Sequence, residues 1–270
     1  MSHQAAFAGL HRSPVPFLLP NAWDVASALL LQDAGFPAVG TTSLGVTAAA
    51  GLPDGAGAGR DLTIALAETL AVRLRVPVTV DLEGGYCDDP REVARIARRL
   101  ADAGVAGVNL EDGRPDGSLR PAAEHAAVIA AVTAAAPDLF VNARTDTYWL
   151  EPGPAAGRPA ETGRRLRIYR DAGAAGVFVP GLTDPAVVAT LVAEVALPLN
   201  LLWQPGATLA GLGAVGVRRV STGSALYRSA LAAAVATARA AAEGGPSPLP
   251  AIGYGPLQQT VAAAPPARER

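Results

Sequence analysis

The sequence has no lysine, one cysteine and only three histidines among its 270 residues. All 22 basic residues are therefore arginine. Without lysine, aldol chemistry through a Schiff base and attachment of pyridoxal phosphate are excluded, because both need a lysine amine. The single cysteine, Cys87, excludes an intramolecular disulfide and a cysteine-ligated zinc site. A P-loop nucleotide hydrolase is excluded as well, since the motif GxxxxGK[ST] does not occur.

Long apolar runs and a surplus of basic residues are also missing. No window is apolar without interruption over the length of a membrane span, and the first residues lack the apolar run of a signal peptide. We therefore expect a cytoplasmic protein without a membrane partner. The net charge of −2 leaves no basic surplus to displace counterions, so we expect no nucleic-acid partner.

One pattern recurs along the chain: a helical stretch ends in Ala-Gly or Leu-Gly, and a short β-rich run follows. It appears at residues 33–43, 102–112, 171–181 and 212–223. The glycine supplies the left-handed residue that ends a helix before a strand. The pattern predicts alternating helices and strands.

With the remaining β-rich runs, the chain offers eight strand candidates, at 16–20, 38–43, 77–82, 106–111, 139–144, 176–180, 198–203 and 218–223. Helix candidates separate and follow them, at 24–34, 61–74, 90–103, 122–135, 161–172, 185–195, 207–213 and 224–242. Strict alternation predicts a parallel sheet, and eight such units predict a (β/α)₈ TIM barrel of the α/β class. An open doubly wound sheet is the second choice, because no GxGxxG turn follows the first strand.

We expect a single barrel domain over residues 1–243, which includes the last helix. Residues 244–270 are rich in proline, glycine and alanine. That composition predicts an extended or disordered tail rather than a further domain.

Acidic residues follow two neighbouring strands of the predicted barrel. Asp81 and Glu83 lie two positions apart, so on an extended chain their side chains share one face, and Glu111 ends the next strand. Buried carboxylates are costly without a cation, and three of them on adjacent strands predict a Mg²⁺ site that keeps several waters. The alternative is that these acids pair with arginines or cap helices, as Asp112 could.

Other polar residues also follow the strands. Arg144, between Asn142 and Asp146, has forked donors that suit a substrate carboxylate or phosphate, although an ion pair with Asp146 is equally consistent. Residues 41–45 (TTSLG) could form a backbone nest for an anion or an ordinary turn. Asp54 lies in a glycine-rich loop, where an aspartate is usually solvated.

Taken together, these segments resemble the isocitrate lyase/phosphoenolpyruvate mutase superfamily. The resemblance covers about residues 15–240 and rests on segments 21–55, 80–86 (VDLEGGY), 107–113 (GVNLEDG) and 142–146 (NARTD). Residues 198–231 are similar to the phosphonomutase-like branch.

The resemblance implies a (β/α)₈ barrel that binds Mg²⁺ and a 2-oxo acid or dicarboxylate. It implies a homotetramer in which the last helix packs on, or swaps with, a neighbouring subunit. It assigns Asp81, Glu83 and Glu111 to the metal, and Asp54 and Arg144 to catalysis. The resemblance implies that Ser43, Leu44 and Gly45 hold a substrate carboxylate. Together with Asp81, Arg144 and the strand-end residues Trp23 and Asn200, they form the expected substrate-binding set.

The chain also departs from the superfamily. The lyases carry a KKCGH-type loop whose cysteine serves as acid and base, and the phosphoenolpyruvate mutases use a loop with lysine and asparagine. Here residues 111–121 (EDGRPDGSLRP) contain none of these. Where the lyases have a glutamate after the sixth strand, this chain has Pro180 and Gly181. The part of the site expected to hold metal and enolate is therefore kept, while the part that selects the reaction is altered.

The sequence thus predicts a Mg²⁺-dependent enzyme that acts on 2-oxo acids, or on 2-hydroxy acids yielding them, through a metal-stabilised enolate. The reaction would be that of a carbon–carbon lyase or a decarboxylase. One alternative is a phosphonomutase or hydrolase acting on phosphonopyruvate or phosphoenolpyruvate. Another is a barrel that binds a 2-oxo acid without catalysis.

Overall fold

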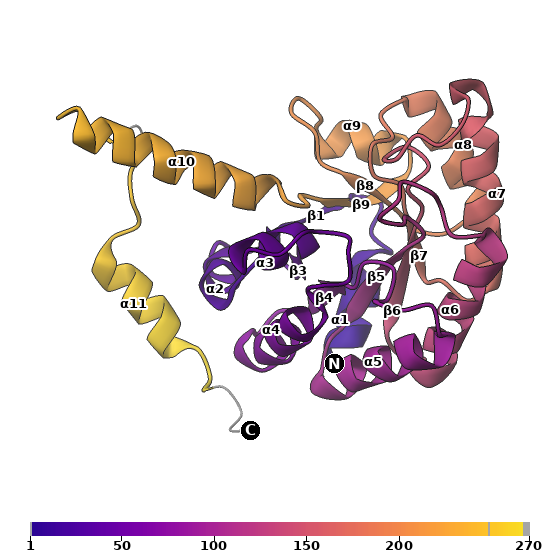
Figure 1. Ribbon diagram of the computed structural model, residues 1–270, viewed down its shortest axis with the longest axis horizontal. Coiled ribbons are helices and arrows are strands. Elements are labelled where there is room, and N and C mark those ends of the chain that lie inside the picture. The colour runs from indigo at the N-terminus through magenta and orange to yellow at the C-terminus, as the bar shows by residue number, and fades with distance from the viewer. Residues whose placement is uncertain (1, 248, 267–270) are drawn as a thin grey trace.

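A computed structural model describes residues 2–247 and 249–266 as a parallel barrel surrounded by helices (Figure 1). The strand order is β1-β9-β8-β7-β6-β5-β4-β3-β2. β1 (Phe17–Leu19) and β2 (Asn21–Ala22) are two halves of one strand interrupted at Pro20. Because β1 pairs with β9 and β2 pairs with β3, these halves join the two edges of the sheet. The predicted (β/α)₈ barrel is confirmed.

The other strands are β3 (Val39–Thr41), β4 (Val78–Asp81), β5 (Gly107–Glu111), β6 (Phe140–Arg144), β7 (Gly176–Phe178), β8 (Leu199–Leu202) and β9 (Val217–Ser221). The helices are α1 (His3–Leu10), α2 (Val25–Asp33), α3 (Ser43–Ala49), α4 (Arg60–Arg73), α5 (Pro90–Ala103), α6 (Ala122–Ala135), α7 (Arg158–Asp171), α8 (Pro185–Val195), α9 (Leu209–Ala214), α10 (Ala225–Ala242) and α11 (Tyr254–Ala263). A short 3₁₀ turn, η1 (Ala155–Gly157), precedes α7. None of the described helices is long and apolar enough to cross a bilayer.

Helix α5 shows how local sequence sets the element boundaries. Asp89 caps its first turn by accepting a hydrogen bond from Arg91 N at 2.9 Å, and Pro90 takes the first helical position. Gly104, with φ of 100°, ends the helix in the left-handed conformation. The predicted range 90–103 is therefore confirmed.

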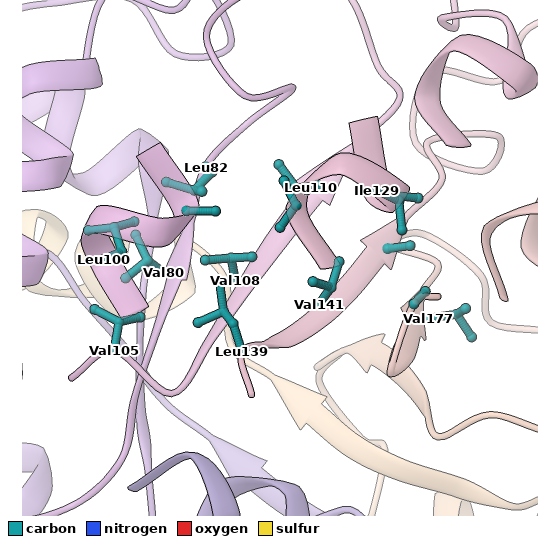
Figure 2. Packing of buried hydrophobic residues seen from close by; sticks show 14 of the residues in the cluster. Val80, Leu82, Leu100, Val105, Val108, Leu110, Ile129, Leu139, Val141 and Val177 are labelled. Carbon is teal, nitrogen blue, oxygen red and sulfur yellow. The ribbon is translucent and has the colours of Figure 1, made fainter. Parts of the chain in front are cut away.

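The main core lies between the strands and the helices that cover them. Figure 2 shows Val80, Leu82, Val108 and Leu110 from β4, β5 and the adjoining loop, with Leu100 from α5 beside them. All five side chains have no exposed surface. Burial of apolar surface of this kind contributes about 25 cal/mol per Å² and holds the strand ends in fixed positions.

A second, smaller core closes the amino end of the barrel. Helix α1, which the sequence did not predict, inserts Phe7 against Phe17 and Phe140, near the starts of β1 and β6. The ring of His11 stacks on Phe140 with centroids 4.0 Å apart. This end of the barrel is therefore filled by aromatic side chains.

The chain after residue 243 differs from the expected extended or disordered tail. Residues Tyr254–Ala263 form helix α11, which returns toward α2 (Figure 1). Arg73 Nη2 donates to Val261 O at 2.9 Å, and Thr260 Oγ1 donates to Asp33 Oδ2 at 3.1 Å. These contacts with α4 and α2 hold helix α11 in place. The composition of the segment could not predict it, because its partners lie far away in the sequence.

Candidate active site

A pocket of about 100 Å³ opens at the carboxyl ends of the strands. Each strand from β2 to β9 contributes one lining residue: Asn21, Thr41, Asp81, Asn109, Arg144, Phe178, Leu202 and Ser221. Loops and short helices add Thr42, Ser43, Leu44, Asp54, Trp149, Pro180, Gly223 and Ser224. The pocket therefore occupies the place where barrels of this type carry their active sites.

Arg144 is held in the pocket by two carboxylates. Its Nη1 lies 2.7 Å from Glu111 Oε2, and its Nε lies 2.6 Å from Asp146 Oδ1. The guanidinium also lies over the Phe178 ring, 5.6 Å from the centroid. Burial alone would lower the pKa of Arg144, but Glu111 and Asp146 raise it well above its usual value. The side chain is therefore a fixed positive charge.

Asp112 fixes the segment that follows Arg144 at the end of β6 and contains Asp146. Its carboxylate is fully buried and accepts hydrogen bonds from Asp146 N at 2.8 Å and Tyr169 OH at 2.6 Å. It also accepts from Thr145 Oγ1 at 2.8 Å and forms an ion pair with a helix α7 arginine. The proposed helix-cap role of Asp112 is therefore wrong, and no short sequence motif could have revealed partners so far along the chain.

Asp81 and Glu83 each leave one buried oxygen without a partner. Asp81 N donates to Thr41 Oγ1 at 3.0 Å, which sets the end of β4, while Asp81 Oδ1 has no hydrogen bond in the described part of the chain. Glu83 Oε2 accepts from Gly57 N at 3.0 Å, while Oε1 has no partner there. Burying such oxygens costs free energy unless a ligand or an ion binds to them.

The backbone and charge of Glu83 are also unusual. Its φ of 51° lies in the left-handed region, which costs a non-glycine residue energy. Burial, with a smaller contribution from the nearby charges of Asp81 and Asp54, raises the pKa of Glu83 to about 7 against the opposing effect of the Gly57 N–H. Strain and a displaced pKa at one residue are typical of functional positions.

The three acids do not converge as the expected trio of metal ligands. Across residues 2–247 and 249–266, no group of three or more His, Cys, Asp or Glu side chains could hold a metal ion. Glu111 differs most from the expectation, because its carboxylate binds the Arg144 guanidinium. Asp81 lines the pocket, whereas Glu83 lines an adjoining cavity of about 240 Å³ beside the loop that contains Gly57.

Residues 43–45 form the first turn of a short helix rather than an open nest or turn. Ser43 and Leu44 line the pocket. A Cβ at Gly45 would lie 2.7 Å from Thr42 Cγ2 and 2.8 Å from Trp23 Cβ, so only glycine fits there. This close packing brings the start of helix α3 to the pocket.

Asp54 also lines the pocket, together with Asp81 and Arg144. Burial raises the pKa of Asp54 above its usual value, and the charge of Asp81 adds to the effect. The Asp54 residue itself is exposed, as expected for an aspartate in a glycine-rich loop, and it lines the pocket.

Three expected substrate-binding residues, Trp23, Gly45 and Asn200, do not line the pocket. The Trp23 ring packs on Tyr227 with centroids 5.4 Å apart. Asn200 is 1% exposed, and its amide hydrogen-bonds to Ser221 Oγ at 3.2 Å. The sequence interpretation in turn missed Trp149 and Phe178, although the alternation of inward-facing positions in 176–180 offered a signal for Phe178.

Comparison with known proteins agrees with the geometry. A 46% identical protein of Mycobacterium tuberculosis, uncharacterized, aligns over 94% of this chain and 95% of its own. A candidate phosphonomutase structure from Burkholderia cenocepacia matches with a TM-score of 0.83 and 40% identity, covering 88% of this chain and 99% of that chain. A 2-methylisocitrate lyase of Bacillus subtilis is 34% identical, over 65% of this chain and 59% of the lyase.

The family comparison covers nearly the whole barrel. The model of the phosphoenolpyruvate phosphomutase family matches residues 7–242, from helix α1 to the end of α10. The chain therefore belongs to the phosphoenolpyruvate phosphomutase family, within the isocitrate lyase/phosphoenolpyruvate mutase superfamily of lyases and mutases.

Proposed function

We propose that this protein is a Mg²⁺-dependent enzyme that acts on a 2-oxo acid, or on a 2-hydroxy acid that yields one. The reaction breaks or forms a carbon–carbon bond, or removes a carboxyl group. One observation carries the proposal: Arg144 is the only basic residue among the described residues that line the pocket, and it shares the pocket with Asp81. The pocket is small beside the roughly 300 Å³ or more of sites for drug-sized ligands, so it suits a small acid.

The acids fit a magnesium ion without the full trio as direct ligands. Asp81 Oδ1 and Glu83 Oε1 are buried carboxylate oxygens that lack a partner in the described structure. Mg²⁺ usually keeps several waters and is bound through only one or two carboxylates, so these two residues would hold it. When bound, the ion supplies positive charge that offsets negative charge developing on the oxo oxygen of the substrate.

The chain's own residues bind and orient the substrate. Arg144, fixed by Asp146 and Glu111, binds the carboxylate next to the oxo group through the guanidinium N–H groups that these two acids leave over. Ser43 and the backbone that follows it contact the other negative end of the substrate.

Asp54 positions the substrate or transfers a proton. A carboxyl group with a raised pKa keeps its proton closer to neutral pH, which suits a general acid or base. Asp54 takes this role because the described pocket contains no histidine or cysteine.

Calorimetry with pyruvate, oxaloacetate and 2-oxoglutarate, each with and without Mg²⁺, tests the proposal. We expect binding only with Mg²⁺, because the uncompensated acids around the pocket otherwise repel an anion. Asp81→Asn should abolish the binding of 2-oxo acids that depends on Mg²⁺. Arg98→Gln, at an exposed ion pair with Asp102, is the matched control and should bind as the wild type does. If none of the three acids binds in the presence of Mg²⁺, the proposal is wrong.

A second candidate is phosphorus–carbon chemistry on phosphonopyruvate or phosphoenolpyruvate. The 40% identity to a candidate phosphonomutase favours it. Phosphorus NMR of each compound incubated with enzyme and Mg²⁺ would detect turnover. An unchanged spectrum, together with turnover of a 2-oxo acid, would remove this candidate. Tight binding without any product would instead favour a non-catalytic barrel.

We also infer a homotetramer in which helix α10 packs on a neighbouring subunit. The helix extends away from the barrel (Figure 1), and Tyr227 is its only buried residue. Leu231 and Val235 are 50% and 53% exposed, which leaves an apolar face for a partner. Light scattering should give about four times the chain mass of 27.2 kDa; a monomer would contradict the inference.

A further inference from the structure

The barrel interior beneath the pocket contains polar side chains. Asn109 on β5, Asn142 on β6 and Arg219 on β9 are 6%, 1% and 0% exposed. The interior of such barrels is usually filled with branched apolar residues. This polar layer therefore needs a physical explanation.

Arg219 is the residue of this polar layer whose burial costs the most free energy. Its Nη2 donates to Asn109 Oδ1 at 3.2 Å, but Nε and Nη1 have no partner in the described part of the chain. Its guanidinium lies over the Phe7 ring, 5.8 Å from the centroid. Burial lowers the pKa of Arg219 to about 9 against the charge of Asp81, so it stays charged at neutral pH. An apolar residue of similar volume would avoid these unmade hydrogen bonds, so stability alone does not explain the arginine.

The contact with Arg219 decides how the Asn109 amide is oriented. A guanidinium can only donate hydrogen bonds, so the amide atom that faces it must be the oxygen. The same oxygen accepts from Asn142 Nδ2 at 2.9 Å. The two donors therefore hold Oδ1 beneath the pocket and leave Nδ2 as the free end of the amide.

The free end of the amide belongs to the pocket. Asn109 is one of the lining residues, paired in register with Asp81 on the neighbouring strand. Its Nδ2 makes no hydrogen bond to any of the described residues and is not sealed from solvent. A preorganised donor that faces a binding pocket is suited to an oxygen of the ligand.

We propose that Asn109 binds the substrate by donating a hydrogen bond from Nδ2 to one of its carboxylate or oxo oxygens, and that Arg219 is the positioning residue that holds the amide for this contact. The inference rests on the proposed function, because the ligand is the same small acid that binds Arg144. It adds a neutral donor beside Asp81 on the floor of the pocket.

Calorimetry with pyruvate and Mg²⁺ tests the contact. Asn109→Leu, which is similar in size but has no donor, should weaken binding by about tenfold to a hundredfold, as expected for loss of a hydrogen bond to a charged group. Thr79→Val is the matched control, because Thr79 is buried in the barrel, lies outside the pocket lining, and has an Oγ1 without a partner in residues 2–247 and 249–266. It should bind pyruvate as the wild type does.

The role of Arg219 has a signature that a purely structural residue would not give. Arg219→Met should leave the melting temperature unchanged or raise it, because a buried charge is removed, and yet weaken pyruvate binding. Arg219→Lys keeps a group that only donates, so it should restore part of the affinity. If Arg219→Met does not fold, the affinity of Arg219→Lys for pyruvate is compared with that of Asn109→Leu to test the positioning role of Arg219.

The outcomes separate this inference from the proposed function. If the wild type does not bind pyruvate with Mg²⁺, both are wrong. If the wild type binds and Asn109→Leu binds equally well, only the role of Asn109 is overturned. If Arg219→Met binds with wild-type affinity, or if Arg219→Lys binds as weakly as Asn109→Leu, the positioning role of Arg219 is overturned.

Discussion

The two ends of the barrel are built from opposite kinds of side chain. At the amino end, Phe7 packs edge-on against Phe140, and His11 stacks on the same ring at 4.0 Å. At the carboxyl end, Asp81 and Glu83 each leave a buried oxygen without a partner in the described chain. One end is filled by apolar contacts, while the other keeps unmet hydrogen-bonding capacity.

The two ends also differ in how burial changes the ionisation of their titratable residues. Burial lowers the pKa of His11 to about 3, so this residue is neutral and packs as an aromatic ring. Burial raises the pKa of Glu83 to about 7, so its charge is costly until something compensates it. Stability is thus gained at the amino end, and part of it is given up at the carboxyl end for binding.

The largest effect is expected from Arg144→Met at the carboxyl end. The substitution leaves Glu111 and Asp146 buried without their cation, so we expect a loss of about 3–5 kcal/mol in the free energy of unfolding. It should also abolish Mg²⁺-dependent binding of 2-oxo acids. Urea denaturation and calorimetry measure the two effects. Arg144→Lys should recover part of the stability but little binding, because lysine lacks the fork; normal affinity in a folded Met variant would contradict the assignment.

Phe7→Ala at the amino end should lower stability without changing the pocket. Phe7 is fully buried, so its truncation should cost about 3–5 kcal/mol. Calorimetry on the remaining folded protein should give close to wild-type affinity for pyruvate, because Arg219 keeps its hydrogen bond to Asn109 even though it loses the Phe7 ring. Phe7→Leu is the milder control. Weakened binding in both variants would show that the two ends are coupled.

The pH dependence of stability should have opposite signs at the two ends. Below pH 6.5 the unfolded chain protonates His11 while the folded chain does not, so this contribution is lost as pH falls toward 3. For Glu83 the folded chain binds the proton first, so its contribution is present below pH 4.5 and is lost as pH rises through 7. Each slope is at most about 1.4 kcal/mol per pH unit.

Urea denaturation between pH 4 and 8, with a chelator present, measures these slopes. His11→Phe should flatten the acid limb, and Glu83→Gln should flatten the limb near neutral pH. Unchanged slopes in both variants would contradict the assigned ionisation states.

The smallest effect is expected away from both ends. Asp89→Ala removes the cap of α5, which accepts from Arg91 N, and should cost about 1 kcal/mol. Asp184→Ala, at the equivalent cap of α8, should cost a similar amount. Neither variant should alter pyruvate binding in calorimetry. A change in affinity would mean that helix caps far from the pocket influence its geometry.

Helix boundaries could be predicted where the chemistry is local. The ranges 90–103, 122–135 and 185–195 match α5, α6 and α8, because apolar spacing and flanking proline, glycine or aspartate act within a few residues. Helices α1 and α11 were missed, because each is held by distant parts of the chain: Phe7 by Phe140, and Val261 by Arg73.

The candidate site was predicted in part. Asp81, Arg144, Ser43, Leu44 and Asp54 do meet in one pocket, as strand ends in a barrel must. Glu111 was predicted to bind the metal, but its carboxylate forms an ion pair with Arg144. That pairing depends on how β5 packs against β6, which the sequence pattern does not specify.

The order of residues along the chain determined the barrel, since alternating apolar strands and amphipathic helices of these lengths can bury their surfaces together in few other ways. Only the folded structure decided how charge is shared inside it: which acid holds Arg144, which stays without a partner, and which face of Asn109 meets the pocket. Periodicity acts over neighbouring residues, whereas electrostatic pairing depends on distances of a few ångströms between residues that are far apart in sequence.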